Sequence, residues 1–279
     1  MKNVVTIGGG TGSYRVLRGI KNISGISISA IVSMADDGGS TGILRKELGV
    51  HPMGDARQCL AALTPSKDLH DFLKYRRPDG HAAGNFFLAD LEKSAGSFEK
   101  GLDIAMKVLD VKGKIIPSTL DNAELIAILP KGEKVEGESN IISMNLKISD
   151  IERVFYKGAV KLNPRAALVI KEADYTIISP GAFYTSIVPN LITEGFKEAL
   201  AKSKTKIIAV ENLESEETDI YVDRLTKYLG KTIDNVIPGN LSLKSEETIV
   251  KEAGDTLARS IARHDSKKLA EVIGKIIKK

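Results

Sequence analysis

Four glycines follow the first apolar segment of the chain, and their spacing suits a phosphate-binding loop. Val4 to Ile7 is a short β-branched run, and Gly8-Gly9-Gly10-Thr11-Gly12 comes directly after it. Consecutive glycines let several backbone N–H groups point into one hollow, and the helix predicted next adds its positive amino-terminal end. We therefore expect a phosphate to contact Gly9, Gly10, Thr11 and Gly12. A tight strand-to-helix turn without a ligand is the alternative, because the segment is neither a Walker A loop nor a strict G-x-G-x-x-G motif.

A second polar loop, Asp36-Asp37-Gly38-Gly39-Ser40, follows the next predicted strand, Ile26 to Met34. In a doubly wound sheet the carboxyl ends of the strands meet at one edge, where ligands bind. Two adjacent carboxylates there could bind ribose hydroxyls or hold a magnesium ion that a phosphate also contacts. We expect Asp36, Asp37 and Ser40 in the binding site, with Asp36 and Asp37 as the candidate metal ligands. A solvated turn is the alternative.

Several later loops offer further polar side chains. Arg57 could meet a phosphate, while Asn212 follows another predicted strand and could read a base edge. The segment 179–186 follows a strand and offers hydroxyls, backbone N–H groups and an aromatic ring, which suits a sugar, a base or a phosphate. The further candidate ligand-binding residues are Arg57, His81, Asn85, Gly181, Tyr184, Ser186, Asn190 and Asn212. Each has a structural alternative, such as helix capping for Asn85 or a turn for Asn190. Asp55 could be a helix cap, and Cys59 lies on an apolar face that indicates core packing.

The order of the predicted elements indicates a parallel α/β sheet. The chain opens as strand, glycine loop, helix and strand, and this rhythm returns after residue 160 and ends in a helix over 266–278. Between about 111 and 156, short β-like pieces separated by proline and glycine predict a β-rich insertion. We therefore predict one α/β domain over 1–279, a Rossmann-like three-layer α/β/α fold with a mostly parallel sheet.

Composition narrows the classes of function. The 279 residues carry 40 Lys+Arg against 36 Asp+Glu, a net charge of +4, with 42% hydrophobic and 27% charged residues. These values are typical of a soluble globular protein and exclude a disordered chain. A single cysteine excludes an internal disulfide framework. No apolar run approaches the roughly 18 residues that span a bilayer. We predict a cytoplasmic protein that binds neither membrane nor nucleic acid; its oligomeric state, including a homo-oligomer, stays open.

The order of the motifs resembles the CofD-like family, and within it the YvcK branch of gluconeogenesis factors. The resemblance covers roughly Val4 to Tyr221. The matching motifs are 8–12, 35–40, Gly54-Asp55-x-Arg57, His81-x-x-Gly84-Asn85, Gly137-Glu138, Asn163-Pro164, and Pro180-Gly181-x-x-Tyr184-Thr185-Ser186 with Pro189-Asn190-Leu191. Two features depart from the family pattern. Gln58 stands where asparagine is usual, and Val222-Asp223-Arg224 replaces part of a longer family segment, so the last third of the chain is short and divergent.

The resemblance implies a nucleotide-type ligand at the strand ends. The YvcK branch implies a regulator that binds UDP-N-acetylglucosamine and links carbon metabolism to cell-wall synthesis and cell shape. The transferase branch implies the alternative, a magnesium-dependent transfer of a phospholactyl group to a deazaflavin, for which positioning and charge stabilisation suffice. The absence of tryptophan favours the binding protein, because the transferases tend to carry a tryptophan-containing deazaflavin pocket. A third alternative, an NAD-dependent oxidoreductase, rests only on the glycine loop and the acidic residue after the second strand. We expect magnesium as the one candidate cofactor and no redox cofactor.

Overall fold

The main sheet contains six parallel strands in the order β3-β2-β1-β7-β8-β9. The computed structural model describes residues 1–212, 218–252 and 255–278, with the backbone alone described for 242–262. The six strands are β1 (Lys2–Gly8), β2 (Ile26–Val32), β3 (Lys114–Pro117), β7 (Tyr175–Ile178), β8 (Lys206–Val210) and β9 (Asn235–Ile237). The strand order reverses between β1 and β7. The loops after these two strands therefore flank the switch point, where open α/β sheets bind ligands.

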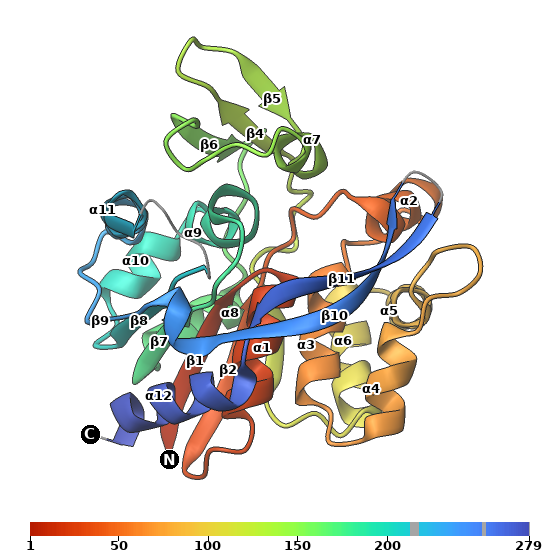
Figure 1. Cartoon of the computed structure of the whole chain (residues 1–279), viewed down its shortest axis with the longest axis horizontal. Coiled ribbons are helices and arrows are strands. Elements are labelled where there is room, and N and C mark those ends of the chain that lie inside the picture. The colour runs from red at the N-terminus through yellow and green to blue at the C-terminus, as the bar shows by residue number, and fades with distance from the viewer. Residues whose placement is uncertain (213–217, 253–254, 279) are drawn as a thin grey trace.

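Helices cover both faces of the sheet, which confirms the predicted three-layer fold (Figure 1). Successive side chains of a strand point to opposite faces of the sheet, and each face has its own hydrophobic core. Val4 and Ile28 pack into the first core, whereas Val5 and Ile31 pack into the second. The first core includes α1 (Gly10–Ile20), α3 (Gly54–Leu63), α6 (Phe98–Val108) and α12 (Ser266–Lys278), extended by α2 (Gly39–Leu48), α4 (Lys67–Lys74) and α5 (Ala83–Ala95). The second core includes α8 (Pro164–Lys171), the π-helical turn η1 (Phe183–Ile187), α9 (Val188–Leu191), α10 (Phe196–Ala201) and α11 (Thr218–Leu229).

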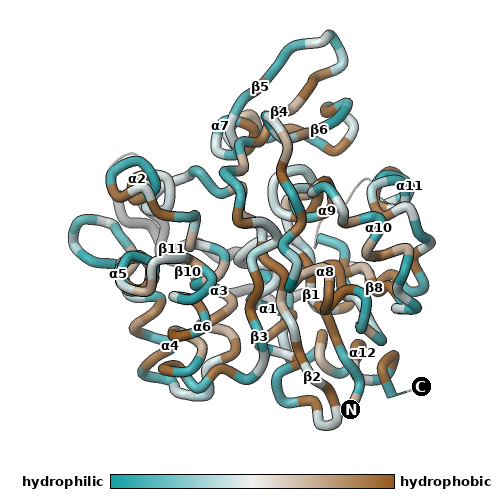
Figure 2. Tube along the Cα trace, turned by 180° about the vertical axis from the view of Figure 1, so that it is seen from behind, coloured by the Kyte–Doolittle hydropathy of each residue, from teal (hydrophilic) through white to brown (hydrophobic). Residues whose placement is uncertain are grey.

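A small antiparallel sheet projects beyond the carboxyl ends of the main strands (Figures 1 and 2). It is formed by β4 (Leu125–Ile128), β5 (Lys134–Glu136) and β6 (Arg153–Tyr156) in the order β5-β4-β6, with α7 (Glu138–Ser143) following β5. Figure 2 shows the turn at its tip as hydrophilic, whereas its base contributes Leu125 and Val154 to the second core. We call residues 124–157 the insertion.

The insertion differs from the sequence-based prediction in two places. Its predicted start at about residue 111 included Lys114–Pro117, but that segment pairs with β2 as an edge strand of the main sheet. The β-like segment predicted up to Ile142 ends at Glu136 and continues as α7. Gly137, at φ +91°, breaks the strand there, because this backbone conformation is rarely adopted by other residues.

Two further elements were not predicted from the sequence. The segment 36–42, expected to be a glycine-rich loop, is helical from Gly39. This helix was not predicted because its glycines are poor helix formers and hide the helical pattern that continues through Leu44. The strands β10 (Leu243–Glu252) and β11 (Asp255–His264) pair in antiparallel fashion and follow the short 3-10 helix η2 (Gly239–Ser242). In contrast, the predicted terminal helix is confirmed as α12. Within the described ranges, no helix combines the length and the apolar composition required to cross a bilayer.

Candidate functional site

The glycine loop after β1 packs against the loop after β7, so the two predicted ligand-binding segments meet at the switch point. A Cβ atom on Gly12 would lie 1.6 Å from the carbonyl oxygen of Pro180, and one on Gly9 would lie 2.8 Å from the Cβ of Ser186. These positions admit only glycine because another backbone or side chain occupies the space. Gly12 and Gly9 therefore join the two loops, while Gly10 and Thr11 face a cavity.

Asp55, from the start of α3, occupies the hollow of the glycine loop. Its carboxylate accepts a hydrogen bond from the backbone N–H of Gly10, and a Cβ on Gly10 would lie 2.6 Å from Asp55 Oδ1. Burial, followed by the negative charge of Asp36, raises the pKa of Asp55 to about 8. Close to neutral pH this side chain can therefore exist as a protonated acid that donates a hydrogen bond. A carboxylate here was not among the predicted ligand-binding residues.

Three acidic side chains from separate segments approach one another beside this loop. Burial raises the pKa of Asp36, although the hydrogen bonds that it accepts from the Gly38 N–H and the Thr41 hydroxyl lower it in part. Glu138 approaches from α7, and burial, then the charges of Asp36, Asp55 and Asp37, raise its pKa to about 8. Buried carboxylates with raised pKa values are typical of functional sites, because buried like charges destabilise a fold unless a ligand compensates them.

The carboxylates fit a magnesium ion only if other ligands complete its coordination. Among the residues that the structure describes, no three of His, Cys, Asp and Glu gather closely enough to hold a metal. Asp36 and Asp55 both line one cavity, and the charge of Asp36 acts on Asp55. Magnesium is commonly held by one or two carboxylates, with water and substrate phosphates supplying the rest. The pair Asp36 and Asp55 therefore suits the ion when a phosphate is present.

Asp37 has a different environment from the one that the sequence suggested. Its carboxylate accepts hydrogen bonds from the backbone N–H groups of Glu138 (3.0 Å) and Ser139 (2.8 Å) and from the Ser139 hydroxyl (2.6 Å). These donors are the first N–H groups of α7, so Asp37 caps that helix from outside. Both oxygens of Asp37 thus accept hydrogen bonds from α7, and the metal-binding role of the pair Asp36 and Asp37 stays a prediction.

The predicted residues Arg57, Asn85, Ser40 and His81 form one chain of hydrogen bonds. Arg57 Nε donates to Asn85 Oδ1 (2.8 Å), Asn85 Nδ2 donates to Ser40 Oγ (3.0 Å), and Ser40 Oγ lies 2.9 Å from His81 Nδ1. Burial and then the nearby charge of Arg76 lower the pKa of Arg57 to about 10. The network joins α2, α3 and α5 and holds Ser40 beside the glycine loop. The contact between Ser40 and His81 joins positions 41 residues apart, so spacing along the sequence could not reveal it.

A cavity of about 210 Å³ lies between these groups. Its lining residues are Gly10, Thr11, Asp36, Gly38, Gly39, Ser40, Thr41, Gly54, Asp55, Arg57, Gln58, Arg76 and Asn85. The lining combines backbone from glycine-rich segments, hydroxyl groups, two carboxylates and two guanidinium groups. This chemistry suits a phosphate group or a sugar with its hydroxyls.

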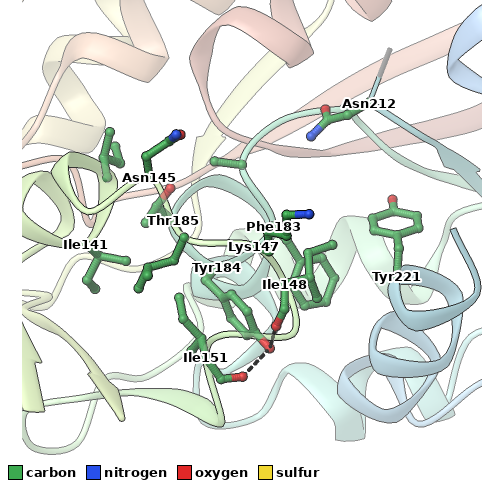
Figure 3. A pocket seen from close by; sticks show the side chains of 13 residues that line it. Ile141, Asn145, Lys147, Ile148, Ile151, Phe183, Tyr184, Thr185, Asn212 and Tyr221 are labelled. Carbon is green, nitrogen blue, oxygen red and sulfur yellow. Dashed lines mark hydrogen bonds between the residues drawn. The ribbon is translucent and has the colours of Figure 1, made fainter. Parts of the chain in front are cut away.

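A larger cavity of about 450 Å³ lies between the insertion and the loop after β7 (Figure 3). Its lining residues are Ile141, Ile142, Asn145, Leu146, Lys147, Ile148, Ile151, Ala182, Phe183, Tyr184, Thr185, Asn212 and Tyr221. Thr185 Oγ1 and Tyr221 OH are shielded from solvent and have no hydrogen-bond partner among the residues that the structure describes. The aromatic rings, the Asn212 amide and these hydroxyls provide a mixed apolar and polar surface that could hold a planar ring.

Tyr184 and Asn212, two further predicted residues, form hydrogen bonds that fix the backbone around this second cavity. Tyr184 OH donates to the carbonyl oxygens of Ile148 (3.3 Å) and Ile151 (3.1 Å), as Figure 3 shows, and Arg224 contacts the same hydroxyl. The Asn212 amide pairs with the backbone of Gly181, accepting from its N–H (2.7 Å) and donating to its carbonyl oxygen (2.9 Å). Asn190 is fully buried and donates to the Ser186 carbonyl (3.0 Å). The predicted binding residues are thus divided between two neighbouring cavities. Those that line neither are Gly9, Gly12, Asp37, His81, Gly181, Ser186 and Asn190.

The sequence contained signals for the residues that the prediction missed. Asp55 belongs to the segment Gly54-Asp55-x-Arg57, from which only Arg57 was selected, and Glu138 belongs to the segment Gly137-Glu138. Asp55 was interpreted as a helix cap, but it reaches across to the glycine loop. The role of Arg224 had no local signal, since its contact with Tyr184 joins positions 40 residues apart.

Comparison with known proteins identifies the relatives of the chain. The family model described as "2-phospho-L-lactate transferase CofD" matches residues 4–278. A Thermotoga maritima relative is 37% identical over 313 aligned residues, which cover 98% of each chain. A Bacillus subtilis relative named gluconeogenesis factor is 32% identical and covers 99% of this chain and 98% of its own. A crystal structure of a Bacillus halodurans protein superposes with a TM-score of 0.81 at 28% identity, covering 98% of this chain and 99% of that one.

Proposed function

Since the chain belongs to the CofD family, we propose that it is a regulatory protein of the gluconeogenesis-factor kind that binds a nucleotide sugar. UDP-N-acetylglucosamine is the proposed ligand, and the proposed role links carbon metabolism to cell-wall synthesis and cell shape. The observation that carries the proposal is the pair of dissimilar cavities at the switch point. A nucleotide sugar has a planar base, a diphosphate and a sugar, which require such different surfaces.

The polar cavity would hold the diphosphate and sugar. The backbone of Gly10 and the guanidinium groups of Arg57 and Arg76 would face the phosphates. Magnesium, if bound, would lie against Asp36 and Asp55 and neutralise part of their charge, which is the chemistry that it supplies there. The larger cavity would hold the base against the ring of Phe183, near the hydroxyl of Tyr221.

A magnesium-dependent transferase is the second candidate, and the contact between Ser40 and His81 is the observation that favours it. A hydroxyl 2.9 Å from an imidazole nitrogen is the geometry of a nucleophile with its base. Asn85, however, donates to the same hydroxyl and is itself held by Arg57, an arrangement that also suits a fixed hydrogen-bonding surface. The two functions differ in whether the ligand is chemically changed.

Calorimetry followed by mass spectrometry tests the proposal. The protein is titrated with UDP-N-acetylglucosamine, UDP-glucose, GDP and NAD, each with magnesium and with chelator. The ligand is then recovered after hours of incubation, with a deazaflavin acceptor and its guanosine diphospho-ester donor offered in parallel. We expect saturable binding of UDP-N-acetylglucosamine and recovery of the intact ligand. Transfer to the deazaflavin would support the transferase, and tight NAD binding without UDP-sugar binding would contradict both.

A further inference from the structure

A third cavity lies away from the switch point, where α1 and α3 end. It has a volume of about 640 Å³, within the range of small-molecule sites. Its walls are the last turn of α1, the turn between α3 and α4, and the first turns of α12. In Figure 1, α12 and α4 lie on either side of the lower end of α1. We call this cavity the basal cleft.

Positive charge gathers in the basal cleft. Arg18 and Lys21 come from the end of α1, Lys67 from α4 and Lys267 from α12, and His70 also lines it. Glu271 is the acidic residue of the lining. In the described part of the chain, Arg18, Lys21 and Lys267 form no ion pair, whereas Lys67 pairs with the exposed Asp71 at 2.8 Å. Three cations thus share the cleft without a paired carboxylate.

Lys21 lies in an unfavourable environment for its positive charge. Its ammonium group is half-buried and donates to the carbonyl oxygen of Thr64 (2.9 Å). Burial, then repulsion from Arg18 and Lys112, lowers its pKa. Ser266 lines the same cleft, and its hydroxyl is shielded from solvent and has no hydrogen-bond partner in the described part of the chain. Arg18 donates to Tyr14 OH (2.6 Å), so these cations have neutral partners but no carboxylate, and an anionic ligand would supply the missing negative charge and an acceptor for the Ser266 hydroxyl.

We propose that the basal cleft is a second binding site, for a small anion that carries two or more phosphate groups. Lys21, Arg18, Lys67 and Lys267 approach it from three helices, so a ligand with several charges can contact more of them than a single phosphate can. The helices α1 and α3 both begin at the polar cavity of the switch point and end at this cleft. The site does not depend on the function proposed for the switch point.

Pyrophosphate is a suitable probe because it presents two phosphate groups and no base. Calorimetric titrations in magnesium-free buffer at about 0.1 M salt compare the wild type with two double variants of equal charge change. Lys21→Gln with Lys267→Gln alters the cleft, while Lys268→Gln with Lys278→Gln alters exposed lysines outside its lining. We expect the cleft variant to lose one class of pyrophosphate sites, or at least about tenfold in its affinity, and the control to match the wild type.

The same series provides the contrary outcomes. Indistinguishable titrations of the two double variants, or no pyrophosphate binding by the wild type, would overturn the proposal. Orthophosphate that bound the cleft as tightly as pyrophosphate would overturn the assignment to a multiply phosphorylated ligand. Thermal unfolding gives a second readout: Lys21→Gln alone should raise the melting temperature without anion, because it removes like-charge repulsion. The same variant should gain less from pyrophosphate than the wild type, and an unchanged gain would count against the cleft.

Discussion

Asp55 illustrates how a single residue can oppose the stability of the free protein. Its carboxyl lies buried beside Asp36, and its pKa is raised to about 8 from an ordinary value of 3.8. Between these two values the folded protein keeps a proton that the unfolded chain releases. The free energy of unfolding should therefore fall as pH rises through this window and remain low above pH 8. A ligand or a metal ion at the site would offset part of this loss.

Replacing Asp55 with asparagine should stabilise the free protein in alkaline solution. Asparagine is close to aspartate in size but cannot ionise, so the variant should gain on the order of 2 kcal/mol above pH 8 and little near pH 4. Urea unfolding at several pH values, in the presence of chelator, measures the difference. Asp103→Asn is a matched control, because that carboxyl is partly exposed and pairs with Arg165. A pH profile for Asp55→Asn that parallels the wild type would contradict the assigned environment.

The same substitution distinguishes the two roles of the carboxylate in binding. If Asp55 holds magnesium, Asp55→Asn should weaken nucleotide-sugar binding mainly when the metal is present. If its protonated form donates to the ligand, the amide should replace it, and binding should become independent of pH near 8. Calorimetry with and without magnesium at pH 6.5 and 9 separates these outcomes.

At the scale of elements, Asp37 connects the insertion to the main sheet. It lies after β2 and caps α7, while Tyr184 and Arg224 hold the carbonyl oxygens that follow α7. The larger cavity lies between these attachments. The geometry of the cavity therefore depends on contacts that lie at its edge.

Asp37→Ala should loosen α7 without unfolding the main sheet. It removes the acceptor of three hydrogen bonds, and a hydrogen bond to a charged group such as this carboxylate is typically worth about 1.5–3 kcal/mol. Hydrogen exchange should increase in residues 137–151 and stay unchanged in β1 and β7. Ligand affinity should fall by a similar factor with magnesium and with chelator, since Asp37 acts through α7. A loss confined to magnesium-containing buffer would support the predicted role of Asp37 as a metal ligand.

The sequence could predict the elements with strong local patterns and could not predict those set by distant contacts. The strand and the helix on either side of the glycine segment and the terminal helix over 266–278 each follow from neighbouring residues, and the structure confirms them. The helical state of 138–143 depends on Asp37, about 100 positions earlier. Similarly, the hydrogen bonds from Glu138 and Ser139 to Asp37 could not be predicted from the residues around position 37. Spacing alone predicted which loops meet at the switch point, but not that their side chains divide into two cavities.

At the scale of the whole molecule, the two ends of the chain pack together. Leu269 and Ile273 of α12 are fully buried in the first core, and Lys2 Nζ donates to the carbonyl oxygen of Ile277. A close approach joins α1 to α12: a Cβ on Gly19 would lie 2.3 Å from the carbonyl oxygen of Ser266. Because α1 starts at the glycine loop, its contact with α12 helps to fix the helix that borders both the switch point and the basal cleft.

Gly19→Ala tests this contact through the sign of its effect. Alanine in the middle of a helix normally stabilises a protein by roughly 0.5–1 kcal/mol relative to glycine. Here the added methyl group meets backbone, so α1 and α12 must separate, and we expect a net destabilisation of about 1–3 kcal/mol. Gly274→Ala in α12 is the matched control, since its Cβ would lie an ordinary 3.6 Å from Ile23 Cδ1. Urea unfolding should show Gly274→Ala as neutral or stabilising and Gly19→Ala as destabilising. If both variants were stabilised equally, the two ends of the chain could not be packed as closely as this structure has them.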